Sequence, residues 1–532
     1  MFLPFIKLLD LTILKNCNSI SPMKNHPILY FAALLCPLIY IASGQPNIVF
    51  IMADDLGPGD VSRQHEERTG RAALAATPTL DALANEGIWF SDAHSPTSLC
   101  SPSRYAVMTG NYNYRSYAPW GVWGTFRPSA ITAEDATLGS VAKAAGYSTG
   151  FIGKWHLGGD FYHKETSKVF RGNDRGEQPL DVDMSKWIAA SPKDFGFDYD
   201  YTLPTGIQGP IYLALENNVW APFNDRSELV HLDKTTAKNL NFISDKGPGP
   251  GDSEWDTAKI NKILADKATG FIERSAAARR PFFMCYWSPA VHLPHIPPAE
   301  LSGQKMRGTT PSHHTDMNRV FDWEVEQIVK ALKAADVYED TIIILSSDNG
   351  GLWDPVAEKV GHLSNGGVRG TKNHPWEGGH LVPFIVTWPG VIEPNTRSDA
   401  LINGTDILAT LADIVGTRLL GSQAKDSYSF LPLLKGDRNF QARDEVMLQA
   451  GAQCELMFRQ GDWKLVMQSD WQLSKMEPIA LFNLVDNPLE MEAKNLIHNP
   501  EYAMKLKSMH ARYLSIRNNP DRSVPLSHRD HW

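Results

Sequence analysis

The sequence predicts an α/β fold with a large mixed, mostly parallel sheet flanked by helices, followed by a smaller C-terminal α+β subdomain containing an antiparallel sheet. Between residue 46 and about residue 417, apolar strand-like runs alternate with helical patterns of ten or more residues. This alternation is typical of βαβ units in a sheet covered on both faces. After about residue 440 the strand-like runs are short and are separated by Gly or Asp, which indicates an antiparallel meander.

The first part begins with the β-rich run 46–53. The strand-like runs that come after it, apart from 381–390, each follow a helical pattern. The helical pattern 77–87 starts at Thr-Pro and stops at Gly, which are helix start and stop signals. The pairs of helical pattern and following strand-like run are 77–87 with 88–93, 134–146 with 147–153, 256–275 with 281–288, and 320–336 with 341–347. The segment 381–390 supplies one more apolar strand.

The C-terminal part contains three short strand-like runs, 445–451, 455–461 and 462–468, and a closing helical pattern over 499–516. We therefore place the first domain at 45–435 and the C-terminal α+β subdomain at 436–532. The Gly- and Pro-rich run 244–254 is interpreted as a surface loop.

The N-terminal 44 residues have the pattern of a leader. From Met23 a short basic start is followed by an apolar run over 28–41 and by the small residues 42–44, which is the pattern of a cleaved signal peptide. We interpret Met23 as the true start. The alternative, a membrane anchor, is disfavoured because the apolar run is short for a span. We expect an exported protein, periplasmic or secreted, without stable membrane insertion.

Composition excludes some classes of function. The formal net charge is −9 over 532 residues, and there is no basic block, so no nucleic-acid binding is expected. Five cysteines, of which Cys17 and Cys36 fall in the leader, are too few for a disulfide scaffold. Cys285 lies in an apolar run and is interpreted as a core residue, and Cys454 has no evident role. Cys100 differs because polar residues flank it.

Polar side chains follow four predicted strands, where each strand ends. They are Asp54 and Asp55 after 46–53, Lys154 and His156 after 147–153, His292 and His295 after 281–288, and Asp348 and Asn349 after 341–347. Singly, each has a plainer interpretation as a turn, a helix cap, a structural histidine or a solvated charge. Because ligands bind beyond the carboxyl ends of strands in open α/β sheets, their shared position predicts one site.

The residue types at this edge suit a metal-assisted reaction on an oxyanion. Three carboxylates and an amide oxygen are hard ligands that favour Ca²⁺ or Mg²⁺ over zinc. Lys154, with Lys372 as a further candidate, suggests a sulfate or phosphate ester as substrate. The histidines could move protons near neutral pH.

The ordered motifs resemble the formylglycine-dependent (type I) sulfatases, an arylsulfatase-like family of the alkaline-phosphatase superfamily. Cys100-Ser101-Pro102-Ser103-Arg104 matches the family's C-x-P-S-R modification signature. The motifs ADDLGPGD, GKWHLG, HLPH, SDNGG, RGTKNHPWEGGHLVPF and LFNLVDNPLEMEAKNL follow the family's order. The resemblance covers nearly everything after the leader. Pro58 replaces the aromatic residue often found in DDLGxGD.

The resemblance implies a role for each matching residue. It implies that a separate formylglycine-generating or sulfatase-maturating enzyme oxidises Cys100 to Cα-formylglycine, whose hydrate attacks sulfur. It implies a Ca²⁺ ion held by Asp54, Asp55, Asp348, Asn349 and the converted Cys100. Arg104 would orient the hydrate, and Lys154 and Lys372 would bind sulfate oxygens. His292 would protonate the leaving alcohol, and His156 would take the remaining hydroxyl proton. His295 would bind the leaving group or support His292, and His374 would reach the cleft or have no role there.

The expected substrate is a sulfated polysaccharide or oligosaccharide. The aromatic stretch 111–128, with Arg115, could line a sugar subsite or could be a packed surface loop, and residues 351–355 have the same two interpretations. One alternative is a phosphoester or phosphonate hydrolase of the same fold. Such enzymes usually hold two metals, and no second set of Asp and His ligands is evident. The other alternative is a non-catalytic glycan-binding protein with an unmodified Cys100.

Overall fold

The structure is a computed structural model that describes residues 44–118, 120–121, 123–173, 176, 178–236, 247–450 and 454–519. The described residues from Gln45 onward form one compact unit. The leader predicted over 1–44, with its start at Met23, lies outside the described residues except for Gly44. Within the described ranges, no helix combines the length and the apolar character needed to cross a membrane.

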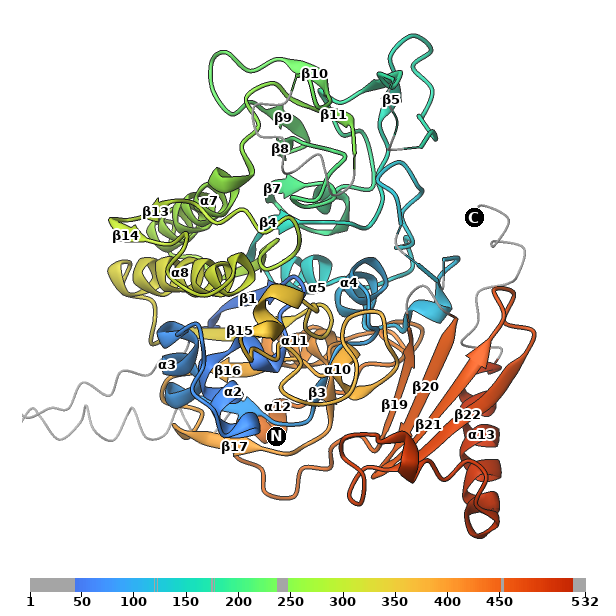
Figure 1. The fold of residues 1–532 in the computed structure, drawn as a ribbon. Coiled ribbons are helices and arrows are strands. Elements are labelled where there is room, and N and C mark those ends of the chain that lie inside the picture. The colour runs from blue at the N-terminus through green and yellow to red at the C-terminus, as the bar shows by residue number, and fades with distance from the viewer. Residues whose placement is uncertain are drawn as a thin grey trace, which may run out of the picture. The chain divides into compact units, whose positions relative to one another are not determined.

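One ten-stranded sheet forms the centre of this unit (Figure 1). Its order is β17 (Thr396–Ser398), β2 (Ile88–Phe90), β16 (Ile385–Thr387), β15 (Thr341–Ser347), β1 (Asn47–Ala53), β12 (Phe282–Trp287), β4 (Ser148–Lys154), β7 (Tyr199–Leu203), β8 (Ala214–Glu216) and β9 (Val219–Ala221). The central strands from β15 to β7 are all parallel. β16, β8 and β9 pair antiparallel toward the two edges. The predicted mixed, mostly parallel sheet is confirmed.

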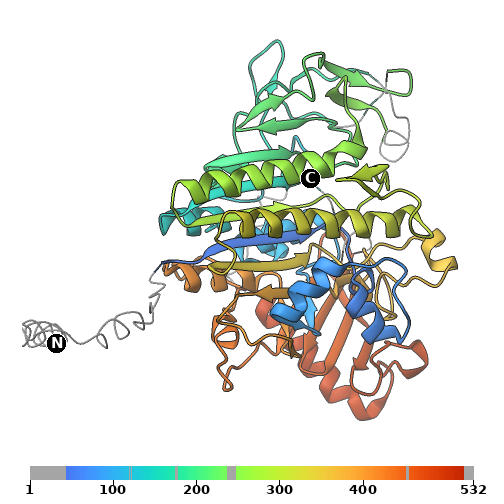
Figure 2. The same cartoon turned by 90° about the vertical axis from the view of Figure 1, so that its left-hand side faces the viewer.

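Helices cover both faces of the sheet, so the central strands are buried on both sides. Alternate residues of β1 belong to two separate apolar clusters, Phe50 to one and Ile51 to the other. The cluster around Ile51 contains residues of α3 (Pro78–Glu86), α7 (Thr257–Ala277) and α8 (His313–Ala334). The cluster around Phe50 contains residues of α4 (Cys100–Thr109), α5 (Leu138–Ala144) and α11 (Asp406–Val415). Figure 2 shows the two long helices α7 and α8, green and yellow-green, side by side across one face.

The C-terminal part contains a separate four-stranded antiparallel sheet, as predicted. Its strands are β19 (Glu445–Gln449), β20 (Glu455–Gln460), β21 (Trp463–Ser469) and β22 (Met476–Asn483). Helix α13 (Ala503–Arg517) packs Met509 and Tyr513 into the same apolar cluster as Phe458 of β20. The predicted boundary near residue 435 falls between α12 (Leu431–Leu434) and β19. Tyr112 and Trp120 from the first part also belong to this cluster.

The remaining elements are short. They are α2 (Ser62–Thr69), α9 (Pro355–Lys359), α10 (Glu377–His380), the 3₁₀ turns η1 (Pro58–Asp60), η2 (Asn113–Arg115), η3 (Pro192–Phe195), η4 (Glu492–Lys494) and η5 (Pro500–Tyr502), and the strand pairs β3 (Ala93–His94) with β18 (Ile402–Asn403), β5 (Tyr162–His163) with β6 (Val182–Asp183), β10 (Leu229–Leu232) with β11 (Gly249–Asp252), and β13 (Glu300–Leu301) with β14 (Gln304–Lys305). β11 corrects the surface-loop interpretation of 244–254, because residues 249–252 pair with β10. Residues 244–246 lie outside the described part.

Candidate active site

The structure brings all four predicted strand ends to one edge of the sheet. Strands β15, β1, β12 and β4 are consecutive neighbours in parallel register. The residues that follow their carboxyl ends therefore lie next to one another. Asp55 and His156 take left-handed backbone conformations, with φ of 69° and 59°. Such strained turns in non-glycine residues are concentrated at functional sites.

Cys100 is the first residue of α4, a ten-residue helix that ends at Gly110 in the left-handed region. The preceding loop is fixed by Ser103, whose Oγ donates to the carbonyl of Thr97 at 3.0 Å. Cys100 is only 2% exposed. Burial raises the pKa of its thiol to about 12, although Lys154 and Lys372 act in the opposite direction. The unmodified thiol is therefore protonated at neutral pH.

Arg104, one turn further along α4, ties the helix to the acidic residues. Its Nε and Nη2 donate to Oδ2 of Asp348 at 3.0 and 2.7 Å, and its Nη1 donates to the carbonyl of Lys154 at 2.8 Å. Burial and the negative charge of Asp54 raise the pKa of Asp348 to about 7. Asp348 is therefore only partly ionised at neutral pH, although Arg104 acts to keep it charged.

Two lysines contact the paired aspartates, one lysine to each. Lys154 donates from Nζ to Oδ2 of Asp54 at 2.5 Å, and Lys372 donates to Oδ2 of Asp55 at 2.8 Å. Burial alone would raise the pKa of both aspartates. Lys154, with His292 and Arg104, outweighs this effect at Asp54, and Lys372 with His292 outweighs it at Asp55. Both aspartates are therefore ionised.

The acidic residues fit a hard divalent cation. Oδ1 of Asp54 and Oδ1 of Asn349 are buried oxygens that have no hydrogen-bond partner in the described part of the chain. Asn349 Nδ2 donates to Asp55 at 2.9 Å, so its free oxygen belongs to the same cluster. Potential ligand atoms of Asp54, Asp55, Cys100 and His292 lie within 4.8 Å of one another. An oxygen-rich set of this kind suits Ca²⁺ or Mg²⁺.

Two histidines complete the centre. His292 Nε2 lies 3.7 Å from Asp55, and its Nδ1 lies 2.6 Å from the carbonyl of Leu293. Burial and Lys372 lower the pKa of His292 to about 3. Burial, with Lys154, also lowers the pKa of His156 well below its usual range. Both rings are neutral before a negatively charged ligand enters.

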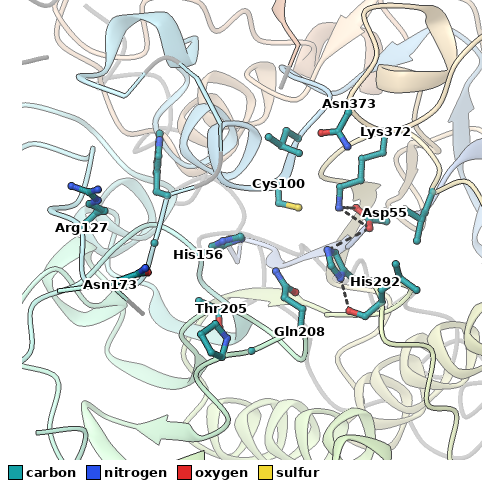
Figure 3. A pocket seen from close by; sticks show the side chains of 17 residues that line it. Asp55, Cys100, Arg127, His156, Asn173, Thr205, Gln208, His292, Lys372 and Asn373 are labelled. Atoms are coloured by element: carbon teal, nitrogen blue, oxygen red, sulfur yellow. Dashed lines mark hydrogen bonds and ion pairs between the residues drawn. The ribbon is translucent and has the colours of Figure 1, made fainter. Parts of the chain in front are cut away.

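Of these side chains, Asp55, Cys100, His156, His292 and Lys372 line one cavity of about 560 Å³. Figure 3 shows Cys100, Asp55, His292 and Lys372 together on one side, with Arg127 and Asn173 on the opposite side. His156, Thr205 and Gln208 lie between the two sides (Figure 3). Trp123, Leu293 and Leu352 add apolar wall. The volume exceeds that of a single sulfate group and falls within the usual range of small-ligand sites.

Three predicted substrate contacts have other surroundings. His295 Nε2 donates to the carbonyl of Val291 at 3.0 Å, and His374 Nδ1 lies 3.2 Å from the backbone nitrogen of Thr371. Neither lines the cavity as described, and their roles stay predictions. Of the stretch 111–128, Trp123, Gly124 and Arg127 line the cavity, whereas Arg115 is buried and pairs with Asp426 at 2.5 Å, so Arg115 belongs to the packed interpretation.

Sequence reasoning missed Gln208, which lines the cavity and accepts from Lys154 Nζ at 3.3 Å. Gln208 follows β7, which is a fifth parallel strand ending at the same edge of the sheet. It also missed a buried group of Asp60, His314 and His362, whose imidazole Nε2 atoms lie 2.8 and 2.7 Å from Asp60 Oδ1. Asp60 also accepts from the backbone nitrogen of Gly57. These contacts connect η1 to α8 and to the loop after α9.

The family model described as Sulfatase matches residues 46–417. An N-acetylgalactosamine-6-O-sulfatase of Bacteroides thetaiotaomicron is 30% identical over 459 residues, which cover 80% of this chain and 83% of the relative. Human steryl-sulfatase is 30% identical over 74% of this chain and 70% of its own length. A solved structure from work on glycosaminoglycan metabolism by Bacteroides thetaiotaomicron superposes with a TM-score of 0.74 at 25% identity, covering 89% of this chain and 100% of that one. The chain belongs to the type I sulfatase family of the alkaline-phosphatase superfamily and is a sulfuric ester hydrolase.

Proposed function

We propose that this sulfatase removes sulfate from a sulfated polysaccharide or oligosaccharide, with a nucleophile made from Cys100 and a bound Ca²⁺ ion. The observation that carries the proposal is that potential ligand atoms of Asp54, Asp55, Cys100 and His292 lie within 4.8 Å of one another, and that Asp55, Cys100 and His292 line a cavity together with Lys372. Mg²⁺ would satisfy the same oxygen ligands.

The state of Cys100 supports its conversion. A thiol whose pKa is raised by burial to about 12 is a poor nucleophile at neutral pH, because the thiolate is the reactive form. Oxidation to formylglycine by a separate maturation enzyme would replace the thiol with a hydrated aldehyde, which supplies a hydroxyl nucleophile. Arg104, which contacts Asp348 and the Lys154 carbonyl, holds the start of α4 in place for that group.

Asp54, Asp55, Asp348 and Asn349 would hold the cation. Ca²⁺ bound there would supply positive charge that favours deprotonation of the nucleophile and withdraws electrons from the sulfate group. Lys154 and Lys372 then bind the sulfate oxygens as the charge on them grows, which stabilises the transition state more than the ground state.

The histidines move protons in this scheme. Both are neutral in the free protein, and the negative charge of a bound sulfate ester favours protonation of His292. His292 would then give its proton to the leaving alcohol. His156, on the other side of Cys100 in Figure 3, would accept a proton when sulfate is released.

The similarity to an N-acetylgalactosamine-6-O-sulfatase and to a structure from glycosaminoglycan metabolism supports a carbohydrate substrate. The basic start, apolar run and small residues over 23–44 support export to the periplasm or the medium.

Two measurements test this function. Mass spectrometry of tryptic peptide 72–104 from native protein should show the sulfur of Cys100 replaced by oxygen. Sulfate release should be faster from defined sulfated oligosaccharides than from an aryl sulfate, and an aryl phosphate should be cleaved poorly. An intact thiol in fully active protein would overturn the nucleophile. Turnover of aryl sulfate alone would overturn the carbohydrate substrate, and preferred cleavage of phosphate would favour the phosphoester hydrolase.

A further inference from the structure

Trp353 is an exposed aromatic residue beside the reaction cavity. Its side chain is 56% exposed, and the preceding residue, Leu352, lines the cavity. Leu293, which is 38% exposed, also lines it. An apolar surface therefore continues from the cavity wall onto the outer surface of the molecule. Large exposed apolar side chains next to a binding site often mark a place where a ligand packs.

The backbone around Trp353 is held firmly. Leu352 donates from its backbone nitrogen to the carbonyl of Asp55 at 3.1 Å, and its own carbonyl accepts from Ser364 Oγ at 2.6 Å. On the other side, Asp354 caps α9 by accepting from the nitrogen of Val356 at 2.8 Å. Trp353 therefore has a fixed position relative to the metal ligand Asp55.

The indole ring is also held. Trp353 Nε1 donates to Oε2 of Glu358 at 3.0 Å, so the polar edge of the ring is occupied while most of the side chain stays open. Sugar rings have apolar C–H faces, and a fixed, open aromatic face binds them at low entropic cost.

A shallow hollow of about 30 Å³ lies at the base of Trp353 and shares Leu352 with the reaction cavity. This volume admits roughly one water-sized group, such as a sugar hydroxyl. Its polar wall includes Asp354, Glu358, Asn365 and Thr371. Carboxylates and an amide are suitable partners for hydroxyl groups.

The charges of the two neighbouring spaces differ. The reaction cavity presents Lys372 and Arg127, whereas the hollow presents the carboxylates Asp354 and Glu358. A sulfate or uronate group at the hollow would meet like charge, which costs binding energy. The hollow therefore suits an uncharged sugar.

We propose that Trp353 is the platform of a second sugar subsite, which binds an uncharged sugar ring joined to the sulfated one. Glu358 holds the platform and excludes an anionic ring from it. This inference rests on the proposed carbohydrate substrate, and it adds that the substrate is at least a disaccharide with a neutral unit beside the sulfate-bearing unit.

The test compares three substrates: a sulfated disaccharide with a neutral neighbouring unit, the same disaccharide with a uronate neighbour, and an aryl sulfate. Trp353→Ala should lower kcat/KM for the neutral disaccharide about tenfold, mainly through KM, relative to its value for aryl sulfate. Trp353→Phe should restore most of the loss. Trp471→Ala is the matched control, because Trp471 is also 56% exposed and should leave the ratio unchanged.

Glu358→Gln should raise kcat/KM for the uronate disaccharide severalfold, because it removes the like charge while keeping an oxygen for the indole. Equal losses on all substrates in Trp353→Ala, or equal use of both disaccharides by the wild type, would overturn the subsite. The subsite would also be overturned if Trp353→Ala changed only the self-association of the protein and left the kcat/KM values unchanged. If the wild type released sulfate from no carbohydrate, the proposed function itself would fail, and the subsite with it.

Discussion

Two buried groups of charged residues in this molecule differ in how completely the chain satisfies them. In the reaction centre, Oδ1 of Asp54 and Oδ1 of Asn349 have no hydrogen-bond partner among the described residues. In the second group, Lys464 of β21 lies 2.9 Å from Glu377 Oε1, 2.7 Å from Glu490 Oε1 and 3.1 Å from His380 Nε2. We call Lys464, Glu377, Glu490 and His380 the interface cluster, because it links α10 to the C-terminal sheet.

The difference shows what each group is for. A buried charge costs several kcal/mol unless charges or hydrogen bonds nearby compensate it. In the interface cluster Lys464 lies within 2.9 Å of both carboxylates, including Glu490 Oε1, which accepts no other hydrogen bond from the described residues. The cluster therefore serves the fold. In the reaction centre Arg104, Lys154 and Lys372 each contact a carboxylate, but Asp54 Oδ1 and Asn349 Oδ1 accept no hydrogen bond from the described residues, which leaves two oxygens for the proposed ion.

The largest expected effect concerns activity. Cys100→Ala should lower sulfate release at least about 10³-fold, because no other group replaces the nucleophile. Cys285→Ala is the control, since Cys285 is also buried but lies within β12. Both variants should lose similar, small amounts of stability in urea unfolding. Cys100→Ala protein with near-normal turnover would contradict the assignment of the centre.

The next effect concerns the interface cluster. Lys464→Met should lower the free energy of unfolding by about 3–5 kcal/mol, because it leaves buried carboxylates without their cation. Lys435→Met, at an exposed position after α12, should change it by less than about 0.5 kcal/mol. Urea titration of both variants measures the difference, and similar values would show that the cluster is not structural.

The third effect sharpens the contrast through the metal. Ca²⁺ at a hundred times its Kd should raise the free energy of unfolding of chelator-treated protein by about 2.7 kcal/mol, because it binds only the folded chain. Asp54→Asn should abolish this rise, and Lys464→Met should keep it. Thermal unfolding with and without Ca²⁺ tests this. An unchanged rise in Asp54→Asn would place the ion elsewhere.

The smallest effect concerns a buried carboxyl group without a cation. Glu324 contacts Asn261 and Ser288, and burial raises its pKa to about 7. Because the pKa of Glu324 is higher in the folded chain than in the unfolded chain, its protonated form stabilises the fold, fully so at a pH below about 4.5. This contribution is lost as the pH rises through about 7. Glu324→Gln should remove on the order of 2 kcal/mol of pH dependence between pH 5 and 8. Parallel stability–pH curves for wild type and variant would contradict it.

Much of the fold and of the reaction centre could be predicted from the sequence. The buried strands are continuous apolar runs, and the expected run 46–53 differs from β1 by one residue. Because parallel strands end at one edge, the position after each run was enough to bring Asp54, Lys154, His292 and Asp348 together.

The missed features have physical causes. β7 reads YDYTL, in which polar and aromatic residues alternate, so it lacks the apolar signal that revealed its neighbours, and Gln208 was missed with it. The pairing of Arg115 with Asp426 joins residues 311 positions apart, and no local pattern indicates such a contact. The strand Gly249–Asp252 has a turn-forming composition and becomes a strand only by pairing with β10.

The burial of the modification signature has a consequence for the order of events in the protein's life. All five residues from Cys100 to Arg104 are buried in the folded chain. An enzyme that modifies Cys100 must bind this segment, and the segment is inaccessible once the sheet and its helices have packed around it. If Cys100 is oxidised as proposed, that step would therefore come before folding is complete, and a molecule that folded first would stay inactive.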